Sequence, residues 1–126
     1  MKRNKGFTLV ELISILTILG IIALITIPIM TKTINKSKEK AREVQIEEII
    51  KAAKKYAIKN SYVLPENVGS HTSIEIETLI NENYIDTDQI IDPVTETPIT
   101  GCINICYKCS EVEYEYFPKE QRCRFP

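Results

Sequence analysis

An uncharged apolar run constrains this chain more than any other feature. Residues 12–31 contain no charged side chain, and most of these twenty positions are Leu, Ile, Ala or Val. As a helix rising ~1.5 Å per residue, the run spans roughly 30 Å, which is the thickness of the hydrocarbon core of a bilayer. No small-x-small cleavage site follows at residues 26–30, so the run does not resemble a removable secretory signal. It predicts a membrane helix that stays attached to the chain.

The helical pattern continues beyond the apolar run. Apolar residues recur at spacings of three and four, which places them on one helix face: Ile46, Ile49, Ile50, Ala53 and Ala57. We therefore expect one nearly continuous helix over residues 7–60. Its first half, 7–31, is apolar all round and suits lipid or a bundle interior. Its second half, 32–60, is an amphipathic stem.

Residues 61–126 are expected to form a small α+β head. Thr72 and Glu75 have the spacing of a capping box, which predicts a loop at 70–73 and then a short helix ending near Ile80. Asn83 suits the left-handed position after such a helix. Alternating residues at 103–107 and 112–116 predict an antiparallel hairpin. The expected fold class is α+β: a long N-terminal helix with a small antiparallel sheet packed on its second half.

Charge is distributed unevenly along the chain, although the formal net charge is only -1. Residues 1–6 carry three bases, residues 32–59 carry nine bases and four acids, and residues 60–126 carry four bases and twelve acids. The bases before the run predict a cytoplasmic N-terminus, whereas the lysines after the run favour the opposite orientation. A basic stem and an acidic head predict a salt-sensitive attraction between copies. The acidic head is not expected to bind nucleic acid directly.

Glu11 is the one charge between Gly6 and Lys32. A carboxylate costs about 2.5–3.5 kcal/mol at the bilayer centre and less near an interface, so it predicts a cationic partner. If the chain were cut after Gly6, the new amino group of Phe7 would supply that cation to Glu11 of a displaced neighbour, and the pair would set the register. The alternative is an ordinary acid at a helix start, stabilised by the helix dipole.

The residues around Glu11 resemble the prepilin cleavage and methylation motif of type IV pilins and pseudopilins: Lys5-Gly6-Phe7-Thr8-Leu9-Val10-Glu11-Leu12. The resemblance covers residues 1–30, from a short basic leader to the apolar run. It implies that residues 1–6 are a leader, that a prepilin peptidase cuts between Gly6 and Phe7 and methylates the new Phe7 terminus, and that Glu11 is the assembly carboxylate.

Gly20 and Pro28 stand where many pilins carry Gly and Pro. Both disfavour a helix interior, so the segment between them is a candidate for melting when the subunit leaves the membrane. Pro28 could instead be a simple kink, which membrane helices tolerate. Residues 61–65, 79–85 and 92–95 also resemble small pseudopilins of Gram-positive-type systems, in which Gly is common at the position of Asn83.

The resemblance implies a structural subunit of a type IV pilus-like or pseudopilus filament, with no enzymatic activity and no cofactor. The implied partners are copies of itself and other pilins, the prepilin peptidase, an inner-membrane assembly platform with its ATPase, and membrane lipid before assembly. The implied location is the cell membrane, crossed once with the head exported, and then a cell-surface filament. DNA uptake (competence), secretion, adhesion and motility all stay open as roles of that fimbrium.

Four cysteines lie in the last quarter of the chain: Cys102, Cys106, Cys109 and Cys123. An even number clustered in a small exported domain predicts disulfides. Four thiolates could instead bind zinc, but only one pair has the C-x2-C spacing. Of the three connectivities we favour Cys102–Cys123 with Cys106–Cys109, because these bonds would clamp the tail to the hairpin and staple its tip. Both bonds together predict no free thiols.

Weaker candidates remain. Asp86, Asp88 and Asp92 could bind calcium, but their spacing is not that of an EF-hand, and a solvated acidic loop is favoured. His71 is interpreted as a surface residue of a polar loop. Two rival functions are an anchored binding domain that never polymerises and a catalytic exoprotein tethered by its helix. The sequence offers no reactive side chain with a base partner for the second.

Overall fold

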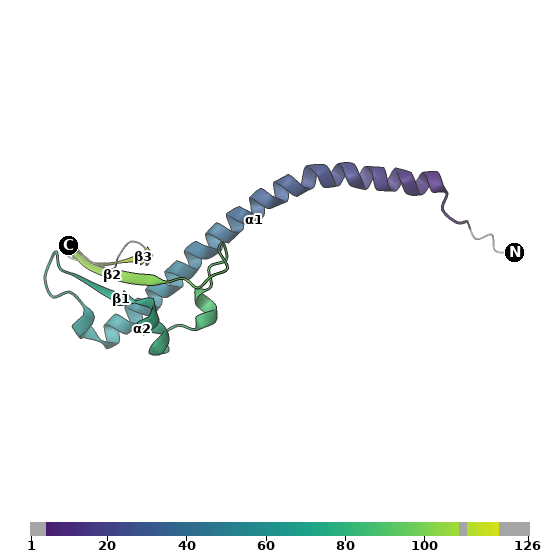
Figure 1. Ribbon diagram of the computed structural model, residues 1–126. Helices are drawn as coiled ribbons and strands as arrows, with labels where there is room; N and C mark the ends of the chain where they lie inside the picture. Colours follow the sequence, from purple (N-terminus) through teal and green to yellow (C-terminus); the bar gives the residue numbers. More distant parts are fainter. Residues whose placement is uncertain (1–4, 109–110, 119–126) are drawn as a thin grey trace. The chain divides into compact units, whose positions relative to one another are not determined.

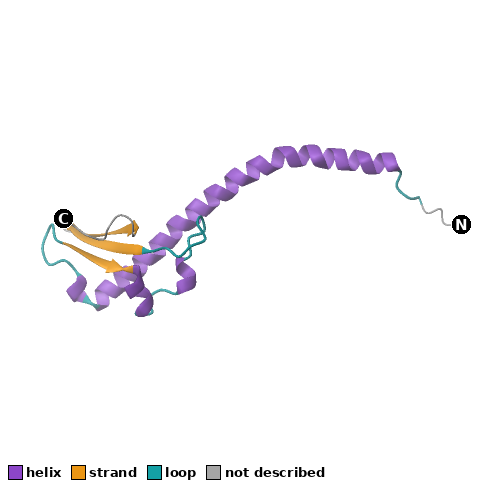
Figure 2. Cartoon of the chain, in the orientation of Figure 1, coloured by secondary structure: helices purple, strands orange, loops and turns teal. Residues whose placement is uncertain are grey.

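The computed structural model describes residues 5–108 and 111–118 of the chain (Figures 1 and 2). The chain divides into two compact units, Met1–Ser37 and Lys38–Pro126. The helix α1 spans Leu9–Lys59 and is shared by both units. The predicted continuous helix is therefore confirmed, with ends within two residues of those expected.

In the first unit, α1 exposes its apolar side chains on every side. Leu, Ile, Val and Met residues from Leu9 to Met30 are between 46 % and 77 % exposed in the isolated chain. Pro28 lies inside the helix. The helix is long and apolar enough to cross a membrane. No other element in the described part of this unit covers these apolar side chains, so in the isolated chain their surface stays exposed.

The second unit joins the end of α1 to a three-stranded antiparallel sheet (Figure 1). The elements after α1 are η1 Ser61–Val63, β1 His71–Glu75, α2 Ile76–Asn81, η2 Thr87–Ile90, β2 Gly101–Lys108 and β3 Glu111–Pro118. The sheet order is β1-β2-β3, so β2 is central. The predicted hairpin is confirmed: β2 pairs with β3 from Lys108↔Glu111 to Gly101↔Pro118.

The strand β1 was not predicted. The sequence pattern predicted a loop at 70–73 and a capping box from Thr72 to Glu75. Both predictions are wrong. Thr72 instead pairs with Ile105 of β2, and α2 begins at Ile76 without a side-chain cap. Local propensity was overridden because β1 supplies backbone partners to the free edge of the central strand.

A single apolar cluster holds the second unit together. Ile49, Ala53 and Ala57 of α1 are completely buried, as their spacing predicted. They contribute to one core with the fully buried Ile103 and Ile105 of β2. The same cluster includes Ile74, Ile76, Leu79, Ile85, Ile90 and Ile99. Helix and sheet thus share one core, and the expected α+β fold class is confirmed.

The turn after α2 provides a test of local backbone strain. Asn83 has φ of 57°, the left-handed conformation that its sequence position predicted. Left-handed backbone costs a residue with an ordinary Cβ about 1–2 kcal/mol, and Asn tolerates it better. Asn83→Ala should therefore lower the free energy of unfolding by about 1 kcal/mol, whereas Asn83→Gly should leave it unchanged or raise it. Thermal unfolding of the two variants measures the difference, and equal destabilisation by Ala and Gly would contradict the backbone argument.

Candidate processing and assembly segment

The bond between Gly6 and Phe7 lies outside the helix. Residues 5–8 are non-helical, and Gly6 and Phe7 are exposed, Phe7 by 85 %. A Cβ added at Gly6 would meet no atom within 4 Å. The peptide bond is thus exposed and lies outside regular secondary structure, two residues before α1 starts at Leu9.

Thr8 and Glu11 form a capping box at the start of α1. The backbone N–H of Thr8 donates to Glu11 Oε2 at 2.8 Å, and the backbone N–H of Glu11 donates to Thr8 Oγ1 at 3.3 Å. Two helix-terminal donors without intrahelical partners are satisfied by this exchange. The T-x-x-E spacing was visible in the sequence but was not recognised there. It gives Glu11 a local structural role in the single chain.

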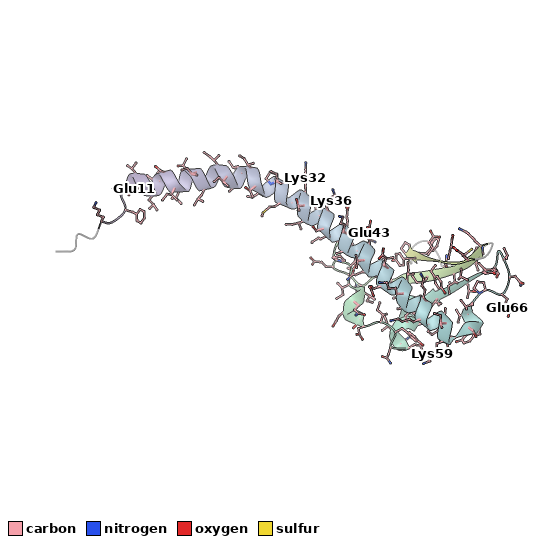
Figure 3. All side chains as sticks on the ribbon, turned by 180° about the vertical axis from the view of Figure 1, so that it is seen from behind. Glu11, Lys32, Lys36, Glu43, Lys59 and Glu66 are labelled. Carbon is pink, nitrogen blue, oxygen red and sulfur yellow. The ribbon has the colours of Figure 1, made fainter. Side chains whose placement is uncertain are left out.

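The capping box does not neutralise the charge of Glu11. Within the described residues the carboxylate forms no ion pair, and its Oε1 accepts no hydrogen bond that the structure records. The next charge along α1 is Lys32, roughly 30 Å away at ~1.5 Å per residue. Figure 3 shows Glu11 at the start of α1 and Lys32 far along it. Among residues 5–108 and 111–118, Glu11 therefore has no cationic partner.

The hydroxyl groups of the apolar segment are satisfied within the helix. Each of five Ser or Thr side chains donates to the carbonyl four residues earlier, at 2.7–3.2 Å: Ser14, Thr17, Thr26, Thr31 and Thr33. A hydroxyl without a partner is costly in hydrocarbon. Because these groups turn inward to the backbone, residues 9–31 of α1 present an apolar surface interrupted only by the charge of Glu11.

Gly20 and Pro28 both lie within continuous α1. A Cβ at Gly20 would meet nothing within 4 Å, so packing does not require glycine there in the single chain. Pro28 removes the backbone donor that would bond the carbonyl four residues earlier. Melting of the segment between them stays a prediction.

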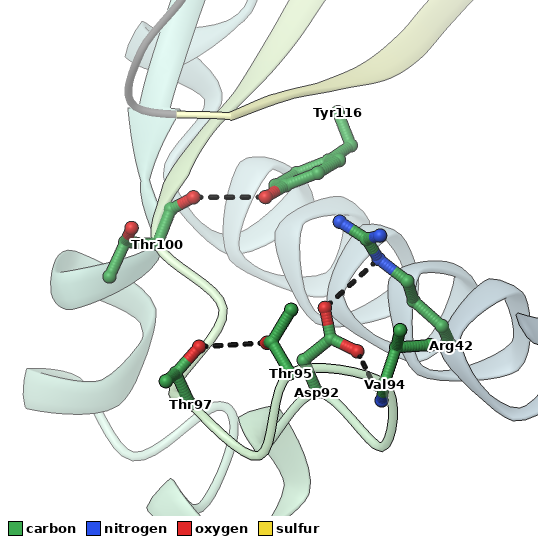
Figure 4. A network of polar contacts seen from close by, with 7 residues as sticks. All are labelled: Arg42, Asp92, Val94, Thr95, Thr97, Thr100 and Tyr116. Atoms are coloured by element: carbon green, nitrogen blue, oxygen red, sulfur yellow. Dashed lines mark hydrogen bonds and ion pairs between the residues drawn. The ribbon is translucent and has the colours of Figure 1, made fainter. Parts of the chain in front are cut away.

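One of the three aspartates in the acidic loop, Asp92, forms an ion pair with α1. Asp92 is almost buried, with 5 % of its side chain exposed, and its Oδ2 lies 3.1 Å from Arg42 Nε on α1 (Figure 4). Its Oδ1 accepts the backbone N–H of Val94 at 2.8 Å. Asp86 and Asp88 are exposed at η2. Among the described residues, no group of three or more acidic, Cys or His side chains could hold a metal.

The cysteines differ from the favoured pairing. Cys102 is completely buried and disulfide-bonded, whereas Cys106 has a free thiol. The predicted Cys106–Cys109 bond, and with it the absence of free thiols, is therefore wrong. Cys106 lies within β2, and the extended chain through Lys108 leads away from it, while a disulfide requires Cα atoms about 4.4–6.8 Å apart. Cys109 and Cys123 lie outside the described residues.

The single histidine is also placed differently from the prediction. His71 is exposed, as expected, but it begins β1 and pairs with Cys106 of β2 rather than lying in a loop. The missed strand accounts for the difference, because the pairing partner of His71 is distant in sequence.

Comparison with known proteins finds a match at the N-terminus, in the segment described above. Residues 1–27 match the family model described as the prokaryotic N-terminal methylation motif. No curated protein and no solved structure gives a significant match to the chain. The matched region contains the exposed Gly6–Phe7 bond, the capping box and most of the apolar surface of α1. The chain therefore carries, at its N-terminus, the methylation motif that is the signature of type IV pilins and pseudopilins.

Proposed function

We propose that the chain is a prepilin, a structural subunit of a type IV pilus-like or pseudopilus filament. The observation that carries the proposal is the arrangement of Gly6, Phe7 and Glu11. An accessible Gly-Phe bond precedes a helix whose residues 9–31 carry one charge, a carboxylate that has no ion-pair partner among the described residues, and the matched methylation motif contains both.

The proposed assembly exchanges lipid for protein around α1. The exposed apolar side chains of residues 9–30 are covered by lipid in the membrane and by equivalent helices in a filament. Hydrophobic burial therefore differs little between the two states, and packing and polar contacts must favour the filament. Cleavage after Gly6 creates an amino group on Phe7, four residues before Glu11. In this proposal the Phe7 amine of one copy pairs with Glu11 Oε1 of the next.

Orientation follows from the same segment. The leader bases Lys2, Arg3 and Lys5 hold the N-terminus on the cytoplasmic side, and the second unit is exported. A membrane prepilin peptidase would meet the exposed Gly6–Phe7 bond at the cytoplasmic face. An assembly platform and its ATPase would then draw the mature subunit into the filament with other pilins.

Processing provides the direct test. The mature protein should lack residues 1–6 and carry one added methyl group on Phe7, which mass spectrometry of membrane and filament fractions measures. Gly6→Leu should block the cut, because a large side chain replaces the residue before the scissile bond, and the variant should keep its full mass. Gly20→Ala serves as the matched control, since it changes a glycine of the same segment but leaves the cleavage site intact.

Filament material with an intact Met1 terminus would contradict the proposal. An uncut chain found only as a membrane-held monomer would favour the alternative, an anchored binding domain that does not polymerise.

A further inference from the structure

A pocket of about 250 Å³ lies on the second unit between α1, the loop 91–100 and β3. Its polar lining comes from all three segments: Arg42, Asp92, Thr95, Thr97, Thr100 and Tyr116 (Figure 4). Pro98, Ile99 and Pro118 supply apolar surface between these groups. The three threonines are exposed, so the pocket is open to solvent. Polar groups that are far apart in the sequence therefore converge on one concave site.

Backbone hydrogen bonds hold the loop wall of this pocket in one conformation. Within the loop the N–H of Asp92 donates to the carbonyl of Thr97 at 2.9 Å, and the N–H of Glu96 donates to the carbonyl of Asp92 at 2.8 Å. At the base of the loop the N–H of Ile99 donates to the carbonyl of Ile90 at 2.7 Å. A ligand would not have to order this wall, and a preformed site loses less free energy on binding.

The charged groups at the pocket occur in opposite pairs. Arg42 Nε lies 3.1 Å from Asp92 Oδ2, and Asp92 has only 5 % of its side chain exposed. Lys38 Nζ of α1 lies 4.0 Å from Glu96 Oε1 of the same loop. A charged ligand would meet a like charge beside the opposite one, so that attraction and repulsion offset each other. The pocket therefore favours a neutral ligand.

Several hydrogen-bonding groups of the pocket retain free capacity. Arg42 uses Nε for Asp92, and the structure records no contact of its two Nη groups with the described residues. The hydroxyl of Tyr116 donates to the carbonyl of Thr100 at 2.9 Å, so its oxygen is left to accept. The hydroxyls of Thr95 and Thr97 lie 2.8 Å apart. One of them donates to the other, and the second keeps its hydrogen for a ligand.

We propose that this pocket binds a neutral, polyhydroxylated ligand of the size of one sugar ring, such as a hexose unit of a glycan. Each sugar hydroxyl both donates and accepts, which matches the mixture of donors and acceptors in the lining. The planar fork of Arg42 can donate to two neighbouring oxygens, and the oxygen of Tyr116 can accept. The C–H groups of the ring would lie against the apolar surface of Ile99 and the two prolines.

The size of the pocket suits a single ring. Its volume of about 250 Å³ is slightly below the roughly 300–1,000 Å³ of pockets that enclose drug-sized ligands. Because the pocket is open to solvent, the rest of a glycan could extend away from it. Such binding is a function of the second unit alone, and it goes beyond the proposed filament role.

A ligand-observed NMR titration of the full chain tests the proposal. The protein is solubilised in a detergent without a sugar headgroup, since a maltoside would compete for the site. The probes are the methyl glycosides of glucose, galactose, mannose and N-acetylglucosamine, with methyl glucuronide and inorganic phosphate as charged comparisons. At least one neutral glycoside should bind saturably, and both anions should bind at least about tenfold more weakly, because Asp92 opposes them. No saturable binding of the four neutral glycosides, or tighter binding of either anion, would overturn the proposal.

Two variants locate the binding. Tyr116→Phe removes the accepting oxygen and keeps the ring. Arg42→Lys keeps a cation beside Asp92 but removes the planar pair of donors. Each should lower the affinity for the bound glycoside by about tenfold, since each deletes a hydrogen bond. Tyr107→Phe is the matched control, because Tyr107 lies on β2 outside the pocket, and it should leave the affinity unchanged.

Thermal unfolding of each variant establishes that it is folded. Thr95→Val, which replaces an exposed hydroxyl of the pocket by a methyl group, takes the place of a variant that is not. Unchanged affinity in the pocket variants would show that the sugar binds elsewhere, and would overturn the proposal. These measurements involve no filament, so the outcome of the filament experiments does not alter them.

Discussion

Glu11→Ala is expected to yield a protein that is processed and held in the membrane but scarcely polymerised. The substitution replaces the lone charge of the apolar surface by a methyl group, so membrane insertion should survive or improve. Cleavage should also survive, because Gly6 and Phe7 are unchanged. In the filament, however, the amine of a neighbour's Phe7 would lose its partner. Removing one member of a buried ion pair typically costs about 3–5 kcal/mol. We expect this loss of binding free energy at every subunit interface to prevent assembly.

The capping box makes sharper variants available. Glu11→Gln keeps an acceptor for the backbone N–H of Thr8 and removes only the charge, since Gln serves as well as Glu in a capping box. Thr8→Ala removes the hydroxyl that accepts the N–H of Glu11 and keeps the charge. If the charge directs assembly, Glu11→Gln should fail like Glu11→Ala, and Thr8→Ala should polymerise.

The measurement is the ratio of sheared filament to membrane-held mature subunit in each strain. Normal filament yield from Glu11→Ala would show that this carboxylate does not direct assembly. Normal yield from Glu11→Gln together with loss in Thr8→Ala would assign Glu11 to helix capping alone, which is the alternative interpretation of the residue.

Asp92→Ala should clearly destabilise the second unit. The substitution removes the 3.1 Å contact with Arg42 and the acceptor of the Val94 N–H at 2.8 Å. Both contacts tie the segment before β2 to itself and to α1 (Figure 4). The carboxylate is nearly buried, but Arg42 is 44 % exposed and regains water when its partner is lost. The expected decrease in the free energy of unfolding is therefore about 2–3 kcal/mol, below the range for a fully buried pair.

Asp88→Ala is the matched control for Asp92. Asp88 is a carboxylate of the same acidic stretch, but it is exposed and makes no contact that the structure records. Its replacement should change stability by less than about 0.5 kcal/mol. Thermal unfolding of the detergent-solubilised chain, followed by the near-UV signal of its tyrosines, compares the two. Equal effects, or a rise in the unfolding temperature of the unaltered chain with calcium, would show that Asp92 acts in a solvated acidic site instead of an ion pair.

The sequence by itself determined the features that depend on local pattern. The long helix follows from apolar periodicity, which α1 confirms at Ile49, Ala53 and Ala57. The hairpin follows from strict alternation, which β2 and β3 confirm. The methylation motif is a short linear pattern, so it could be recognised without knowing the fold. It matches the family model over residues 1–27. Asn83 was predicted for the same reason, because a left-handed turn selects residues locally.

Tertiary structure decided what depends on pairing between distant residues. β1 forms because β2 offers a free edge, which outweighs the capping-box signal at Thr72 and Glu75. Asp92 is an ion-pair partner because folding brings it to Arg42, fifty positions earlier in the chain. Cys106 stays a thiol because an extended strand carries the chain away from it. Each of these outcomes is set by backbone geometry that brings remote groups together or keeps near ones apart, and no local pattern encodes that geometry.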